Sequence, residues 1–342
     1  MKLIDYVGGK IVGELIDNLK LYSEPWDGDP SKDRDKFIGG SDVGTILGVN
    51  KFKSPYVLFL EKTGKLEPEN IDNKLQVKLG HKMEQVVAEL YEEETGIKLT
   101  KSNRSYRCKK YPFLVGHIDR KTIGVKKGIE IKTTSSWNKT DYSEGEVPPS
   151  HYYQCMFYMM ITGIHDWDLA TLRDNNEFHI THVKWDEYIA EDMLKECIDF
   201  WKCVESGVWD KPIDGEKNTS YAITRAFPGS EETSENDNTS VSIYGQNDSM
   251  DAYMEIVSSI KELEKSKSAF ENEIKSVLGD KQVGFIGDEY KVTWMNRSRK
   301  GSIDTEKIKS DHPEIDIEKY RKQETKYREF KITPIKKKEL RG

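Results

Sequence analysis

The stretch Phe113-Leu-Val-Gly-His-Ile-Asp119, followed after a short turn by Ile129-Glu-Ile-Lys-Thr133, decides the fold. Both segments are short, apolar and contain β-branched residues, which is typical of strands. The glycines of Gly124-Val-Lys-Lys-Gly128 between them indicate a turn. We therefore predict two neighbouring strands, with Asp119 at the end of the first brought alongside Glu130 on the second.

Helices and further strands surround this pair. Apolar side chains recur at helical spacing from Asn73 to Thr95, and Gly96 ends that helix. Pro148-Pro149-Ser150 opens a second helix that runs through Met160. The remaining predicted elements are a third helix and three strands, at Glu187–Val204, Arg104–Cys108, Leu169–Leu172 and Glu177–Trp185. Strands flanked by helices in this order predict an α/β domain.

The C-terminal part differs in composition from the rest. Residues 230–240 are polar and acidic, which indicates a linker. We predict a body at 1–220, an acidic linker at 221–250 and an accessory module at 251–342. The module begins with a charged, heptad-like helix from Asp251 to Leu278, followed by a hairpin around Gly284–Phe285 and Tyr290–Trp294 and a basic tail.

Charge and composition restrict the function. The 342 residues carry a net charge of -7, yet residues 291–342 hold 16 Lys+Arg against 9 Asp+Glu, so this tail is +7 and the remainder -14. An acidic body with a basic tail suits an enzyme that holds metal and grips phosphates. No apolar run is long enough for a membrane span, and the N-terminus lacks a signal segment, so we expect a cytoplasmic protein. Four scattered cysteines are expected to be reduced and buried.

Alternation along the second strand puts Glu130 and Lys132 on one face. Carboxylate oxygens from Asp119 and Glu130 suit Mg²⁺, or Mn²⁺ in its place. Phosphodiester hydrolysis needs such a metal to activate water, and Lys132 could act as a base or as a cation beside the phosphate. The spacing alone leaves a surface ion pair open, because Glu-x-Lys recurs at Glu273–Lys275, Glu289–Lys291 and Glu329–Lys331.

Two helices offer further candidates. Glu84 lies on a semi-apolar helix face, where it is either part of the metal site or an ordinary surface glutamate. Gln154 and Tyr158 lie one turn apart, and the pair could contact a DNA phosphate or belong to the half-buried face of an amphipathic helix.

The whole pattern resembles the YqaJ-type viral recombinases, phage exonucleases related to the lambda exonuclease within the PD-(D/E)xK nuclease superfamily. The matching segments occur in the family's order across residues 34–205: Phe37–Gly48, Gly80–Glu84, Gly116–Asp119, Ile129–Thr133 and Pro148–Gln154. The resemblance implies a restriction-endonuclease-like fold, in which helices flank a mixed central sheet. It also implies an Mg²⁺-dependent 5′-to-3′ exonuclease with a two-metal site, which acts on ends of double-stranded DNA. It further implies a homotrimer and a single-strand annealing protein as recombination partner.

The resemblance also implies roles for individual residues. Asp119, Glu130 and the backbone carbonyl of Ile131 would bind metal, and Lys132 would be the catalytic lysine. Glu84 would lie in the outer metal or water shell, and Gln154 would contact the substrate phosphate. Ser41 would bind phosphate near the active site, although Ser41 or Asp42 could instead be a helix N-cap, and Arg34 would bind a 5′ phosphate.

Other functions remain open at this point. The chain could be a PD-(D/E)xK endonuclease, a Cas4-like exonuclease with a cysteine-held iron–sulfur cluster, or a DNA-binding or assembly protein whose nuclease site is inactive. The tail lies outside the core resemblance. Its Arg297, Arg299 and Lys300 beside Trp294 form either a DNA-gripping patch or a solvated strand.

Overall fold

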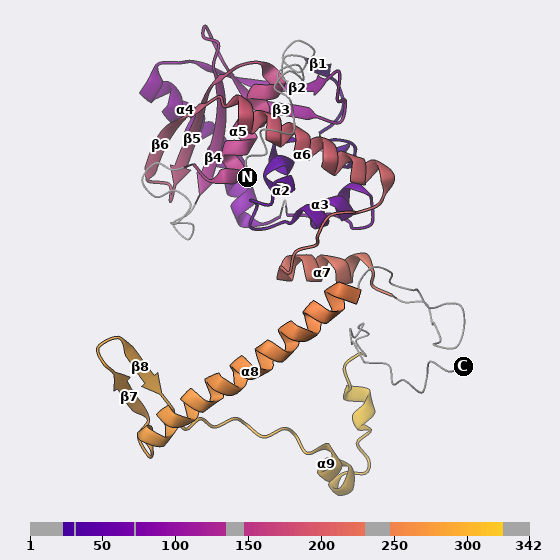
Figure 1. Cartoon of the computed structure of the whole chain (residues 1–342), viewed down its shortest axis with the longest axis vertical. Coiled ribbons are helices and arrows are strands. Elements are labelled where there is room, and N and C mark those ends of the chain that lie inside the picture. The colour runs from indigo at the N-terminus through magenta and orange to yellow at the C-terminus, as the bar shows by residue number, and fades with distance from the viewer. Residues whose placement is uncertain (1–22, 31, 72, 135–146, 230–246, 324–342) are drawn as a thin grey trace, which may run out of the picture. The chain divides into compact units, whose positions relative to one another are not determined.

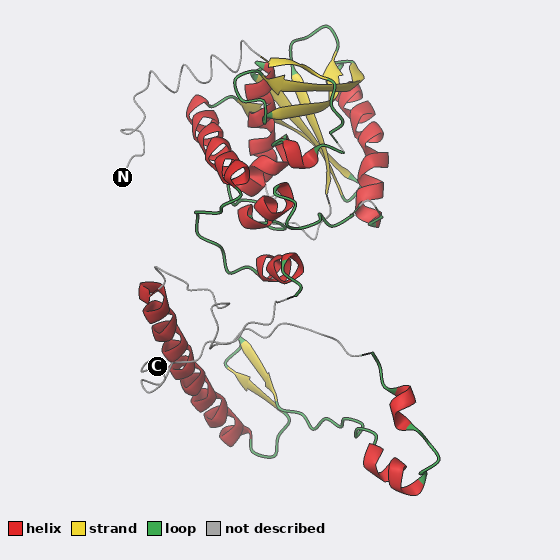
Figure 2. Cartoon of the chain, turned by 90° about the vertical axis from the view of Figure 1, so that its right-hand side faces the viewer, coloured by secondary structure: helices red, strands yellow, loops and turns green. Residues whose placement is uncertain are grey.

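The computed structural model describes residues 23–30, 32–71, 73–134, 147–229 and 247–323. The chain divides into two compact units, Met1–Gly229 and Ser230–Gly342. In the first unit, helices lie on both sides of the strands (Figure 2). Its elements in chain order are β1 (Ser23–Trp26), η2 (Arg34–Lys36), α2 (Gly40–Ile46), α3 (Pro55–Lys62), α4 (Leu75–Thr95), β2 (Leu99–Cys108), β3 (Val115–Thr122), β4 (Gly128–Thr134), α5 (Pro149–Thr162), β5 (Asp166–Arg173), β6 (Glu177–Lys184), α6 (Glu187–Ser206) and α7 (Lys217–Ala226), most of which are labelled in Figure 1.

The strands form two three-stranded sheets, β1-β2-β3 and β4-β5-β6. All strand pairs in the first sheet are antiparallel, whereas β4 and β5 are parallel and β5 and β6 antiparallel. β3 lies next to β4, but within the described residues no hydrogen-bonded ladder joins them. The predicted α/β fold with mixed strands is therefore confirmed, although the expected single central sheet consists of two sheets side by side.

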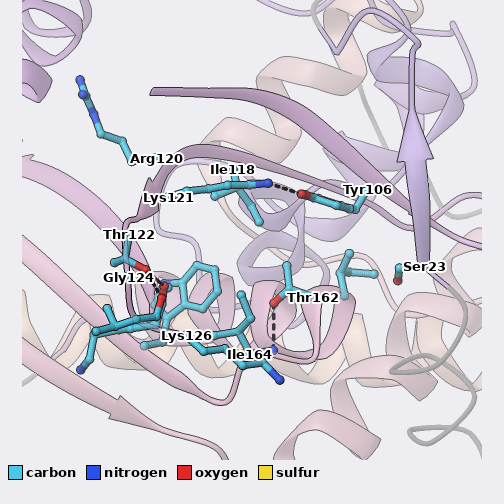
Figure 3. Close-up of a pocket in the computed structure, with 15 residues that line it drawn as sticks. Ser23, Tyr106, Ile118, Arg120, Lys121, Thr122, Gly124, Lys126, Thr162 and Ile164 are labelled. Atoms are coloured by element: carbon cyan, nitrogen blue, oxygen red, sulfur yellow. Dashed lines mark hydrogen bonds between the residues drawn. The ribbon is translucent and has the colours of Figure 1, made fainter. Parts of the chain in front are cut away.

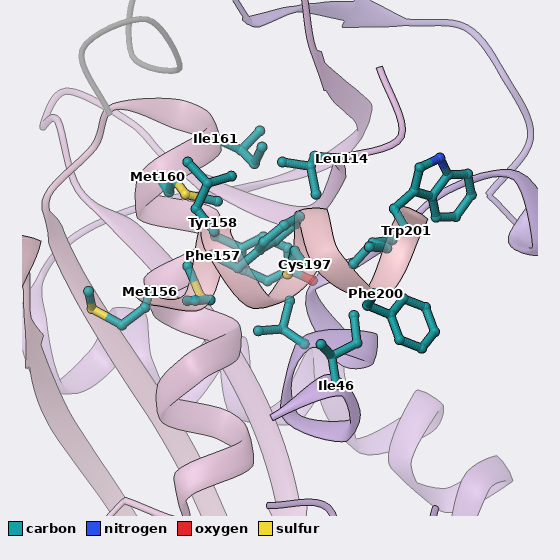
Figure 4. Close-up of a cluster of buried hydrophobic side chains, with 14 of the residues drawn as sticks. Ile46, Leu114, Met156, Phe157, Tyr158, Met160, Ile161, Cys197, Phe200 and Trp201 are labelled. Carbon is teal, nitrogen blue, oxygen red and sulfur yellow. The ribbon is translucent and has the colours of Figure 1, made fainter. Parts of the chain in front are cut away.

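Two hydrophobic clusters hold the first unit together. The larger lies among α2, α3, α5 and α6, and α5 is buried continuously from Gln154 to Ile161 (Figure 4). The smaller lies between α4 and the β4-β5-β6 sheet and contains Val87, Tyr91 and Ile129. Because α5 is apolar almost all round, it is a central helix, as expected for such a pattern.

Glycines allow α2 to lie directly against α5. A Cβ atom at Gly40 would stand 2.8 Å from the ring of Tyr158, and one at Gly44 would stand 3.0 Å from the Cα of Ser150. Any larger residue at these positions would push the two helices apart. Gly40, in the Gly-Gly-Ser-Asp segment, and Gly44, one turn later, thus have a packing role.

The second unit contains α8 (Asn247–Leu278), β7 (Val283–Ile286), β8 (Tyr290–Thr293), α9 (Thr305–Asp311) and η5 (Ile317–Tyr320). The predicted heptad-like helix and hairpin are both present, and the hairpin's Gly284 lies against Leu278 at the end of α8. Of the predicted acidic linker, residues 230–246 lie outside the described residues. Its first part, however, belongs to α7, which packs on α3 through a 2.7 Å hydrogen bond between Ser54 and Thr219. Among the described helices, none combines the length and the apolar character needed to cross a membrane.

Candidate active site

β4 places Glu130 and Lys132 on the same face, as alternation predicts. Ile129 belongs to the cluster under α4, whereas Glu130 turns to the other face of the strand and meets α5. The Lys132 Nζ atom lies 2.6 Å from Glu130 Oε1, and only 7% of Glu130 is exposed. A carboxylate this deeply buried requires partners, and here the ammonium group is one of them.

Gln154 is the second partner of the Glu130 carboxylate. Its Nε2 atom donates to Glu130 Oε1 at 2.8 Å and also lies 3.1 Å from the hydroxyl of Tyr158, one turn later on α5. Tyr158 in turn lies against Gly40 at the start of α2. The structure therefore brings Glu130, Lys132, Gln154 and Tyr158 together and links them to the helix that carries Ser41.

Asp119 lies on β3, the strand next to β4, but its side chain is outside the described residues. The strand pairing is irregular at this point. Ile118 pairs with Arg104, while Arg120 pairs with Lys101, so two residues of β2 face Asp119 alone. A β-bulge of this kind changes the direction of the neighbouring side chains and is frequent beside active sites.

Glu84 makes an ion pair that the sequence did not reveal. The Arg120 guanidinium lies 3.0 Å from Glu84 Oε1 and donates to Gln85 Oε1, also at 3.0 Å. Arg120 is only 6% exposed and directly follows Asp119, so it joins β3 to α4 next to the predicted metal ligand. The one sequence signal for this ion pair was an arginine inside a strand that borders a carboxylate-rich helix.

The loop before α2 differs in its capping from the expectation. The N-cap is Gly39 rather than Ser41 or Asp42, and the Gly39 N–H donates to Asp42 Oδ2 at 3.1 Å. The reason is that an acidic residue at the third helical position can bond back to the cap residue's amide. Ser41 is exposed at the first turn, and Arg34 is exposed on η2.

A buried lysine fixes this loop. Lys62, at the end of α3, donates to the carbonyl oxygens of Arg34 and Phe37, the latter at 2.6 Å, and to Asp42 Oδ2 at 2.8 Å. Its side chain is only 4% exposed. Lys62 therefore satisfies acceptors both in the loop before α2 and in the first turn of α2. Sequence reasoning missed it because its acceptors are mainly backbone atoms more than twenty residues away.

A second polar cluster lies at the start of β5. Asp166, Asp168 and His182 place ligand atoms within 4.8 Å of one another, close enough to share a metal ion. However, Lys127 Nζ already lies 2.7 Å from Asp166 and 2.9 Å from Asp168, so the lysine ammonium group already contacts both carboxylates. Burial opposes ionisation of Asp168, but hydrogen bonds from Lys127, His182 and Tyr91 outweigh it and hold the pKa of Asp168 below its ordinary value.

A pocket of about 480 Å³ opens beside the turn between β3 and β4 (Figure 3). Its lining includes the apolar Ile118 and Trp167, and its cations include Lys121 and Lys126. Lys121 extends to the hydroxyl of Tyr106. The positive charge of these lysines favours an anionic group in the pocket.

The cysteines behave as expected. All four are free and buried, and burial raises the pKa of each thiol (Cys108, Cys155, Cys197 and Cys203). They are core residues of the larger hydrophobic cluster.

Comparison with known proteins adds the following findings. A family model described as the YqaJ-like viral recombinase domain matches residues 31–165. The uncharacterized protein YqaJ of Bacillus subtilis (strain 168) is 30% identical over 310 residues, which is 89% of this chain and 93% of that protein. Among crystal structures, an alkaline exonuclease from Laribacter hongkongensis matches with a TM-score of 0.43 and 17% identity over 57% of this chain and 95% of its own. A phage-related exonuclease from Haemophilus somnus 129PT matches with a TM-score of 0.41 and 13% identity over 50% of this chain and 94% of its own.

Proposed function

Because this chain belongs to the family of YqaJ-like viral recombinases, we propose that it is a Mg²⁺-dependent exonuclease. It digests linear double-stranded DNA from 5′ to 3′ and leaves 3′ single-stranded tails for recombination by strand annealing. The observation that supports this most is the buried group on β4 and α5, in which Lys132 and Gln154 both contact the Glu130 carboxylate. A salt bridge on a solvated strand would need neither the burial nor the amide.

The donor set fits a hard divalent cation. Asp119, Glu130 and the backbone carbonyl of Ile131 would hold Mg²⁺, with Mn²⁺ able to substitute and a second ion at the same carboxylates. β4 is the strand of its sheet that borders β3, so alternate β4 carbonyls are directed away from the β5 ladder. When bound, the ion activates a water molecule and offsets charge on the scissile phosphate. The Asp166 cluster fits less well, because Lys127 contacts both of its carboxylates and both oxygens of Asp168 already have protein partners.

Each protein side chain then has a defined task. Lys132 orients Glu130 and presents positive charge, or a base, to the attacking water. Gln154 keeps its amide fixed between Glu130 and Tyr158, so its position is set before DNA arrives. Tyr158 acts mainly through Gln154, because its hydroxyl contacts the Gln154 amide.

The DNA end would be held by the loop before α2. Ser41 contacts a phosphate near the metal, and Arg34 binds the 5′ phosphate through its planar guanidinium group. Glu84 contributes to the outer shell through Arg120, which lies beside Asp119 on β3. We further propose that the enzyme is a homotrimer, works in the cytoplasm and delivers its 3′ tails to a single-strand annealing protein.

Labelled substrates test the activity and its direction. Linear duplexes labelled at either end, with and without a 5′ phosphate, should release mononucleotides from the 5′ end in Mg²⁺, and a closed circle should stay intact. Cutting of the circle would indicate an endonuclease. Failure to digest any of these substrates in Mg²⁺ or Mn²⁺ would support a DNA-binding protein with an inactive site.

Matched variants test the site. Lys132→Ala should lower the rate at least about 100-fold, as expected for loss of a general base or of a charge at the reacting phosphate. Lys291→Ala is the control, because Glu289-Tyr-Lys291 repeats the same spacing on the exposed strand β8. Asp119→Ala should abolish cleavage while end binding in Ca²⁺ remains measurable. Equal loss of binding would assign Asp119 a structural role instead.

A further inference from the structure

α8 carries an uncovered apolar stripe. The helix has 32 residues and would be about 48 Å long at 1.5 Å per residue. Apolar residues follow a 3–4 spacing along it, with a lysine at one position: Tyr253, Ile256, Ile260, Leu263, Lys267, Phe270, Ile274 and Val277. Within the described part of the second unit this stripe is solvent-exposed except at the half-buried Ile274, with Leu263 at 69% and Phe270 at 66%. Alternating 3–4 spacing is the pattern of a coiled-coil seam.

We propose that α8 pairs antiparallel with α8 of a second copy of this chain. The sizes of the seam residues favour this orientation. If two copies cross near residue 265, Ile260 faces the partner's Phe270, and Leu263 faces the partner's Lys267. Large and small side chains then alternate across the seam, which is how coiled-coil layers fill space.

The parallel orientation is less favourable on the same residues. It would place Phe270 against Phe270 and Lys267 against Lys267, with two like charges in an apolar layer. In the antiparallel pair the aliphatic stem of Lys267 covers the partner's Leu263, and its ammonium lies beside the partner's Glu264. A single lysine in a seam therefore sets both register and orientation.

The area available is sufficient for a stable pair. Eight seam positions, each contributing on the order of 80 Å², bury roughly 600 Å² per copy, or about 1,200 Å² in total, which reaches the range of specific interfaces. An isolated helix draws little stability from propensity alone, so burial of this face would also stabilise α8 itself.

Cysteine cross-linking distinguishes the orientations. All four native cysteines are buried, so a single introduced cysteine reports on α8 alone. Under mild oxidation Glu264→Cys should form a disulfide-linked dimer, because residue 264 lies next to its own symmetry mate in the antiparallel pair. Ile260→Cys should not, because its two copies would be about 15 Å apart along the helix axis. Linking by Ile260→Cys and not by Glu264→Cys would overturn the antiparallel assignment.

The mass in solution tests the pairing independently of orientation. With the proposed homotrimer, three α8 pairs would join two trimers, so Ile260→Lys should halve the mass measured by sedimentation velocity from that of a hexamer to that of a trimer. Ser258→Lys, which adds the same charge on the opposite side of the same helix, should leave the mass unchanged. Circular dichroism and DNA digestion by both variants confirm that the chain is folded. An unchanged mass for Ile260→Lys, with no Glu264→Cys dimer, would show that α8 does not pair with itself.

Discussion

Replacing Lys62 by methionine tests how the loop before α2 is held. Methionine keeps most of the length and apolar stem of lysine but removes three hydrogen-bond donors. It leaves the carbonyls of Arg34 and Phe37 and the carboxylate of Asp42 without the partner they have in the native loop. Because the Lys62 side chain is only 4% exposed, water cannot fully replace the ammonium group.

The expected cost is large. Removing one partner of a buried ion pair typically costs about 3–5 kcal/mol, against a total unfolding free energy of about 5–15 kcal/mol for a domain. Lys62→Met should therefore lower the free energy of unfolding of the first unit by a large fraction, measured by urea denaturation of the full chain. At temperatures where the variant stays folded, its preference for 5′-phosphorylated ends should also fall, since Arg34 is on the loosened loop.

Two controls make the result interpretable. Lys36→Met removes an exposed lysine that pairs with Asp33, and it should leave the denaturation midpoint unchanged. A double-mutant cycle of Lys62→Met with Asp42→Asn should show coupling, because the two side chains share one contact. If Lys62→Met costs less than about 1 kcal/mol, as for an exposed ion pair, then Lys62 does not hold this loop.

Three further predictions follow from the same structure. Gly44→Ala should destabilise the chain by about 1–3 kcal/mol through overpacking. Gly80→Ala, whose Cβ meets nothing closer than 3.5 Å, should instead stabilise it by up to about 1 kcal/mol. Thermal unfolding compares the two variants, and equal effects would contradict close packing at Gly44. Asp168→Asn should reduce stability near neutral pH. Because the folded-state pKa of Asp168 lies below its ordinary value of 3.8, the difference from wild type should be present above that pH and disappear as pH falls through the folded pKa. An unchanged difference at low pH would assign it to packing. Gln154→Leu should lower the cleavage rate at least about 10-fold with little change in end binding in Ca²⁺, and unaltered cleavage would remove Gln154 from the site.

Local patterns predicted most of the secondary structure. Periodicity, with the helix stop at Gly96 and the helix start at Pro148, located α4 and α5, and alternation placed Glu130 and Lys132 on one face. Boundaries were less accurate, since β2 begins at Leu99 rather than Arg104 and β5 at Asp166 rather than Leu169. Those residues extend each strand through pairing with a neighbour, which a single segment does not encode.

The long-range contacts of the site could not be predicted. The ion pair of Glu84 with Arg120 and the hydrogen bonds of Lys62 join segments whose approach depends on the whole fold. The packing role of Gly40 could not be predicted either, because nothing in its own segment indicates that Tyr158 occupies the adjacent space. The functional roles of all the site residues, Glu130, Lys132 and Gln154 included, stay predictions.

The boundary between β3 and β4 has a mechanical consequence. Asp119 and Glu130 belong to different sheets, and no described ladder ties those sheets together at this boundary. A divalent ion bound by both residues would cross-link the two sheets. Because the ion would bind only when the sheets are in contact, its binding would stabilise that contact. Mg²⁺ should then slow amide hydrogen exchange in β3 and β4 more than in β6. Binding of the metal would thus also make the boundary between the two sheets more rigid.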